Sequence, residues 1–150
     1  LVVLEENLVL TRQLNAQEFL SGVLLLLGLA MQESGEQTRA RSLLMECFAI
    51  MQAHDLLYDT GSYAFNAYLF SGLAGLVEPL RAAGVLGCVA RLLTTASELQ
   101  DFASEHSHYE RILSTVRAQL DEATFTAAWV KGQAMSPDEA VRYAIAALLT

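Results

Sequence analysis

Histidines and serines are the first residues of this chain to weigh as chemical groups. His106 and His108 are its only close pair of histidines. Residues two apart point to different faces of a helix, so the pair makes a poor metal site, and a solvated helix start is the simpler interpretation. Ser62, Ser71 and Ser107 have no identifiable histidine and aspartate partners. We therefore expect no catalytic residue, no metal ligand and no cofactor, and the chain is not predicted to be an enzyme.

Two acidic pairs have the residue types for general acid–base work, Asp121-Glu122 and Asp138-Glu139. Each pair is expected in the first turn of a helix, where negative charge is favourable in any case. The order Ser136-Pro137-Asp138-Glu139 is a complete helix-start signal, with a capping serine, a proline in the first turn and a glutamate that closes the capping box. Helix capping is therefore the stronger interpretation of both pairs.

An aromatic cluster offers a candidate ligand groove. Its members are Tyr58, Tyr63, Phe65, Tyr68 and Phe70. Most such residues are core or repeat-to-repeat contacts. Tyrosine hydroxyls and Asn66 on an otherwise apolar helix also suit a ligand or a partner. The candidate groove residues are Tyr63, Asn66 and Phe70, and both interpretations stay open.

Composition restricts the classes of partner. The net charge is −8, and the nine basic residues are scattered, so a nucleic-acid surface is not expected. Cys47 and Cys88 form no metal or redox motif and are interpreted as reduced, packed thiols in a reducing compartment. The apolar run at 23–31 is too short to span a bilayer. We expect a cytoplasmic protein without membrane contact.

The stretch from Ser21 to His54 predicts two helices joined by a turn at Gly35. Its first helix is apolar on almost all sides and must be buried. Small residues stand at four places: Gly28, Gly35, Ala40 and Cys47. In this respect the stretch resembles a tetratricopeptide repeat (TPR), in which helices A and B cross closely at small residues.

The remainder extends this pattern in both directions. Residues 1–14 resemble the second helix of a preceding repeat, 16–54 form the TPR-like hairpin, and 58–99 form a degenerate second hairpin in which Gly84 matches Gly35. Residues 107–150 are expected to be a C-terminal helical cap, with Phe125 and Trp129 closing over the stripe of 109–120, and Gly132 ending a helix in the left-handed conformation. We expect one all-α domain over 1–150, a right-handed TPR-like superhelix of antiparallel hairpins, as a fragment of a larger protein. Residues 1–14 are predicted to support a weak homodimer.

The tail carries a second resemblance. Residues 109–146 contain Phe125, Ala127-Ala128-Trp129, Gly132, Met135-Ser136 and Glu139-Ala140. The segment is similar to the closing part of large bacterial LuxR-type ATPase transcriptional regulators. The resemblance implies a non-catalytic helical-repeat module that makes protein–protein or intramolecular signalling contacts with a protein partner or with other domains of its parent. The alternative is a domain that senses a small-molecule inducer in a pocket on the concave helix face.

Overall fold

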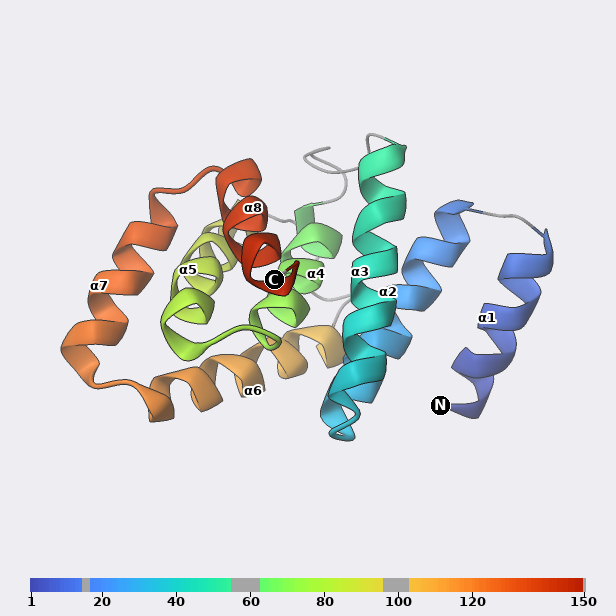
Figure 1. Cartoon of the computed structure of the whole chain (residues 1–150), viewed down its shortest axis with the longest axis horizontal. Coiled ribbons are helices and arrows are strands. Elements are labelled where there is room, and N and C mark those ends of the chain that lie inside the picture. Colours follow the sequence, from blue (N-terminus) through green and yellow to red (C-terminus); the bar gives the residue numbers. More distant parts are fainter. Residues whose placement is uncertain (15–16, 55–62, 96–102, 150) are drawn as a thin grey trace. The chain divides into compact units, whose positions relative to one another are not determined.

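The computed structural model describes residues 1–14, 17–54, 63–95 and 103–149. Within these ranges the chain forms helices joined by turns and contains no strand. The helices are α1 (Val2–Leu14), α2 (Gln17–Glu33), α3 (Gln37–Ala53), α4 (Tyr63–Ala74), α5 (Pro79–Thr95), α6 (Ala103–Gln119), α7 (Glu122–Gln133) and α8 (Pro137–Leu148) (Figure 1). The prediction of an all-α fold is confirmed for this part of the chain. None of these helices combines the length and the apolar character that a bilayer crossing needs.

The chain divides into two compact units, Leu1–Leu57 and Tyr58–Thr150. The first unit holds α1, α2 and α3, and the second holds α4 to α8. The division falls between the two predicted hairpins, 16–54 and 58–99.

The first unit is built on the hairpin of α2 and α3, which pack along each other (Figure 1). Gly35 stands in the turn with φ +86°, the left-handed region that favours glycine. A Cβ at Gly28 would lie 2.8 Å from Leu44 Cγ, so a larger residue there would force the side chain of Leu44 to shift. Ala40 and Cys47 are completely buried. The small residues therefore have the packing role that their spacing predicts.

Two ion pairs connect α1 with α3. Arg12 donates hydrogen bonds to both carboxylate oxygens of Glu46, at 2.5 and 2.9 Å. Two helical turns earlier on both helices, Arg39 donates to Glu5 Oε2 at 2.7 Å. Both pairs join residues 34 positions apart. Because the two pairs advance together along both helices, α1 and α3 run parallel in a fixed register, as Figure 1 shows.

The second unit is organised around α5, which packs against α4, α6, α7 and α8. Its residues 82–89 are all buried. Pro79 is the first residue of α5, where its missing amide costs nothing. The helices α4 and α5 are separate, because α4 ends at Ala74 and α5 begins at Pro79.

Backbone-to-backbone contact joins α5 to α7. A Cβ at Gly132 would lie 1.7 Å from the carbonyl oxygen of Gly84, and a Cβ at Gly87 would lie 2.3 Å from that of Trp129. Only glycine permits this approach. The two helices can therefore cross nearer than ordinary side chains allow.

Two predictions about this unit are wrong. Gly84 is not a turn glycine, because α5 already begins at Pro79 and Gly84 lies inside it. Gly132 does not end α7 in the left-handed conformation; it lies within the helix, which Ala134 caps. Close glycine contact explains both better than turn chemistry does. The helix carrying Phe125 and Trp129 packs mainly against α5, and Arg117 of the 109–120 segment lies over the ring of Phe125, with Cζ 4.8 Å from the ring centroid.

Candidate functional site

The histidine pair lies on α6, which begins earlier than the polar sequence suggested. His106 is half-buried, and its Nδ1 lies 3.3 Å from the hydroxyl of Tyr68. Its Nε2 lies 3.2 Å from Glu110 Oε1. His108 is only 4% exposed, so the prediction of a solvated helix start is wrong for it. Among the residues that the structure describes, no three His, Cys, Asp or Glu side chains gather as metal ligands would.

Among the other candidate nucleophiles that the structure describes, Ser71 and the two cysteines are buried. Ser71 is buried, and its hydroxyl donates to the carbonyl oxygen of Tyr68 at 2.8 Å. Ser62 lies outside the described residues. Cys47 and Cys88 are buried free thiols. Burial raises the pKa of Cys47 to about 12, and its thiol donates to the carbonyl oxygen of Ser21 at 3.3 Å, so it is not a reactive thiolate at neutral pH.

The acidic pairs cap helices, as predicted. Asp121 accepts from the backbone amide and the hydroxyl of Thr124, each at 2.8 Å, and these hydrogen bonds hold the pKa of its carboxyl below the usual value. Ser136 and Glu139 form a reciprocal capping box at the start of α8. Asp138 pairs with Arg142 one turn later. These contacts account for the carboxylates as helix-start groups.

The candidate groove residues all belong to α4. Asn66 is 2% exposed and Phe70 is 1% exposed. The side chain of Tyr63 and all of Tyr58 lie outside the described residues. The amide of Asn66 is unusual, because neither its nitrogen nor its oxygen has a hydrogen-bond partner among the described residues. Asn66 and Phe70 are thus interior side chains, and a groove around them stays a prediction.

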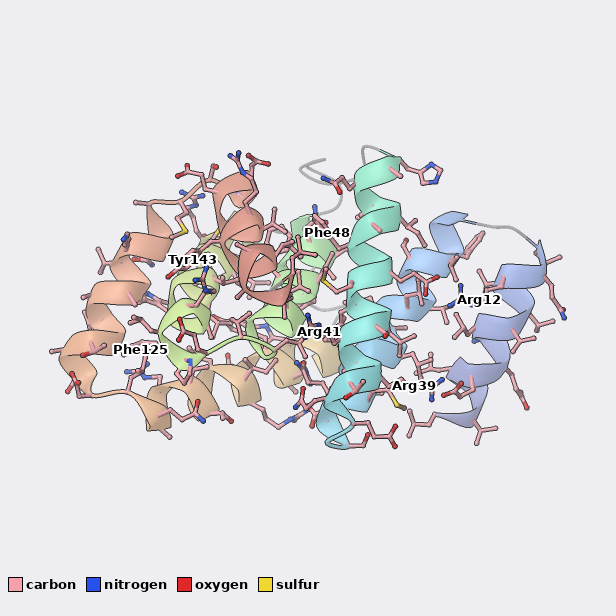
Figure 2. The ribbon with its side chains drawn as sticks, viewed as in Figure 1. Arg12, Arg39, Arg41, Phe48, Phe125 and Tyr143 are labelled. Atoms are coloured by element: carbon pink, nitrogen blue, oxygen red, sulfur yellow. The ribbon has the colours of Figure 1, made fainter. Side chains whose placement is uncertain are left out.

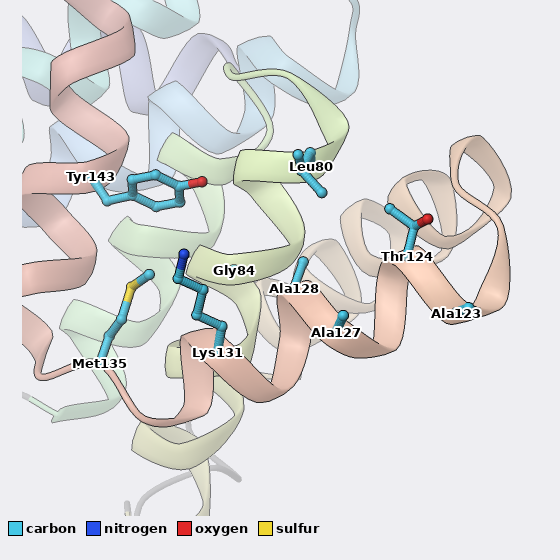
Figure 3. Close-up of a pocket in the computed structure, with 9 residues that line it drawn as sticks. All are labelled: Leu80, Gly84, Ala123, Thr124, Ala127, Ala128, Lys131, Met135 and Tyr143. Atoms are coloured by element: carbon cyan, nitrogen blue, oxygen red, sulfur yellow. The ribbon is translucent and has the colours of Figure 1, made fainter.

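A pocket of about 490 Å³ lies elsewhere, between α5, α7 and α8 of the second unit (Figure 3). Its apolar surface comes from Leu80 of α5 and from Ala127 and Ala128 of α7. Met135 and Tyr143 close the end nearest α8. Pockets for small molecules are mostly apolar, with a volume of roughly 300–1,000 Å³. This pocket meets both criteria.

Few polar side chains line the pocket. Thr124 is engaged with Asp121 through its hydroxyl, whereas Lys131 extends its amine beside the ring of Tyr143 (Figure 3). No acidic side chain belongs to the described lining. This pocket was not predicted from the sequence, because three alanines and a glycine in its wall carry no chemical signal. The available signal was the row of small residues on α7.

The ring of Tyr143 is held from two sides. Arg81 lies over it, with Cζ 4.3 Å from the ring centroid, and donates from Nη1 to the carbonyl oxygen of Tyr143 at 2.6 Å. A Cβ at Gly84 would lie 3.3 Å from its Cε2, which places the ring edge against the backbone of α5. The wall of the pocket at α8 is therefore a fixed aromatic ring.

The other surface with a distinctive character is the outer face of α1. We use this name for five apolar residues that are 54–76% exposed: Val2, Val3, Val9, Leu10 and Leu14. They share one side of the helix at a spacing of seven residues (2 and 9, 3 and 10). Leu8 and Thr11 on the opposite side are buried against the rest of the unit. Figure 2 shows Arg12 and Arg39 between α1 and α3.

No protein-family model matches this chain, and neither the curated proteins nor the solved structures include a significant match to it.

Proposed function

We propose that this chain is a non-catalytic helical-repeat module of a bacterial transcriptional regulator. It makes contacts with a protein partner or with other regions of its parent, and the contact surface is the outer face of α1. The architecture that we propose for it is a right-handed, TPR-like array of antiparallel hairpins. The proposal rests on one observation. The outer face of α1 is apolar and exposed, and α1 lies beside the hairpin of α2 and α3 in a register like that of successive repeats.

The register supports the array. The ion pairs Arg12–Glu46 and Glu5–Arg39 both span 34 residues, which is the length of a TPR unit. Equivalent helices of successive repeats run parallel, and α1 and α3 do so. In this interpretation α1 is the second helix of one repeat and α2 with α3 is the next.

The outer face of α1 supports the contact function. Large apolar side chains that gather on one side of a helix mark an interaction surface more often than a solvated one. In an array, a helix in the position of α1 packs against helices on both sides. An amphipathic helix is therefore the chemical type of partner that suits this face, and a second copy of α1 supplies one when the chain is studied alone.

Sedimentation velocity with a substitution in this face tests the proposal. We expect the wild-type chain to associate reversibly with itself. Val9→Glu should weaken the association by about tenfold or more, because a carboxylate would be buried without a partner. Val130→Glu is the matched control, because Val130 is 57% exposed on a helix and Val9 is 56% exposed. Equal association of the two variants would reject the α1 face as the contact surface.

A second candidate function is the sensing of a small molecule, and the pocket between α5, α7 and α8 is the observation that favours it. This pocket lies in the second unit, apart from the α1 face and apart from Asn66 and Phe70. The two functions are compatible. A ligand that contacts α5, α7 and α8 together would stabilise the folded second unit, because it binds the folded state and not the unfolded one.

A further inference from the structure

The charged residue in the lining of the pocket, Lys131, indicates which class of ligand the pocket would bind. Lys131 is the only lysine in the chain. Within the described residues its ammonium has no carboxylate or carbonyl partner, and no acidic side chain lines the pocket with it. Of the carboxylates at the starts of α7 and α8, Asp121 accepts from Thr124 and Asp138 pairs with Arg142. Lys131 is therefore the one charged residue in the described lining of the pocket, and Arg81 adds a second positive charge against the ring of Tyr143 at its wall.

The pocket has two chemically different ends. Figure 3 shows the amine of Lys131 with Tyr143 and Met135 at one end and the side chains of Leu80, Ala127 and Ala128 away from it. Thr124, the other hydroxyl residue on α7, already donates to Asp121. The apolar end is open because its residues are small. A ligand that satisfies both ends must be charged at one end and apolar at the other.

We propose that this pocket binds an amphipathic monocarboxylate, with its carboxylate on the ammonium of Lys131 and its hydrocarbon part against Leu80 and the alanines of α7. A phosphate group suits the pocket less well, because binding of a dianion uses several donors or an arginine fork, and the lining has one lysine and no arginine. A cationic or neutral amphiphile would fill the apolar end and leave the ammonium unpaired. The inference rests on the second candidate function and is independent of the α1 face.

The single lysine makes a direct test feasible. Reductive methylation with ¹³C-formaldehyde labels Lys131 and the N-terminal amine, and it preserves both charges. Sodium octanoate should shift the Lys131 signal saturably and leave the N-terminal signal unchanged. Octylamine, which has the same chain and the opposite charge, and acetate, which has the same charge and no chain, should produce no saturable shift at equal concentration.

Variants separate the two ends of the pocket. Ala127→Leu fills the apolar end and should weaken octanoate binding at least tenfold. Thr126→Leu, at a neighbouring exposed residue of the same helix that does not line the pocket, is the matched control and should bind like the wild type. Lys131→Met removes the charge and keeps an unbranched side chain only one atom shorter, and its binding can be followed by the fluorescence of Trp129, the only tryptophan in the chain. Octanoate should change this fluorescence in the wild type and not in Lys131→Met.

Three results would overturn the inference. Equal binding of octanoate and octylamine would mean that the pocket recognises only hydrocarbon, so that the carboxylate class is wrong while small-molecule sensing survives. Equal shifts with acetate would reduce the effect to simple ion pairing at an exposed lysine. No saturable shift with any of the three probes, in a protein whose circular dichroism remains helical, would reject both the ligand class and the pocket as a sensing site.

Discussion

At the residue scale, the most constrained positions are the glycines at which α5 and α7 meet: Gly84, Gly87 and Gly132. Gly132→Ala would place a methyl group 1.7 Å from the carbonyl oxygen of Gly84, so the helices must separate. We expect a loss of about 1–3 kcal/mol in the free energy of unfolding, as for other overpacked contacts. Gly22→Ala is the control: a Cβ there meets nothing within 4 Å, and alanine should stabilise α2 by up to about 1 kcal/mol. Urea unfolding of both variants measures the difference, and a Gly132→Ala protein as stable as the wild type would show that the helices do not cross this closely.

The sequence identified these residues better than it identified their roles. Gly28, Gly35, Ala40 and Cys47 could be placed because the small residues of a helical hairpin recur at known positions. Gly84 and Gly132 were assigned to turns, because a glycine in a sequence does not reveal whether it permits a backbone angle or a close approach. The pocket was missed for a related reason: a cavity exists where side chains are absent, and an alanine at its wall looks like any helical alanine.

At the scale of the element, α1 is held by charge as well as by packing. Hydrogen bonds from Arg39 lower the pKa of Glu5, and hydrogen bonds from Arg12 lower the pKa of Glu46. A carboxylate with a lowered pKa in the folded state stabilises that state above its unfolded pKa, and the stabilisation is lost as the pH falls through the folded pKa. The attachment of α1 should therefore weaken in acid.

NMR protection factors for the amides of α1 provide the measurement. We expect them to fall between neutral pH and about pH 3.5, below the ordinary pKa of glutamate. Amides of α3, which packs along α2, should lose less protection. The double variant Arg12→Gln, Arg39→Gln should show little change with pH in α1. Equal pH dependence in the wild type and the double variant would assign the effect to other carboxylates.

Element boundaries could be predicted where capping chemistry is explicit. Asp121, Ser136 and Pro79 mark the starts of α7, α8 and α5 as their sequences predict. The start of α6 could not be predicted in this way. Residues 103–107 are polar and carry no cap signal, yet they belong to the same helix as the apolar stripe that follows. The helix of residues 1–14, which is predicted to self-associate, has two apolar sides: Leu8 is buried on one, and the exposed apolar residues lie on the other. Periodicity finds two apolar sides of such a helix and does not say which one the protein covers.

At the scale of the whole molecule, net charge opposes self-association, whereas the exposed apolar surface favours it. Each chain carries a net charge of −8, so two copies repel at low ionic strength. Salt at about 0.15 M screens this repulsion beyond roughly 8 Å, and the short-range contact of the α1 face then decides whether copies associate. The central claim, that this face is a contact surface of a helical module, is best tested under that condition.

Hydrogen–deuterium exchange over a series of protein concentrations tests it most directly. If the outer face of α1 makes the contact, exchange in peptides covering α1 should slow as concentration rises, while peptides covering α7, which carries the equally exposed Val130, keep a constant rate. Exchange in α1 that does not depend on concentration, or slowing confined to α7, would contradict the account.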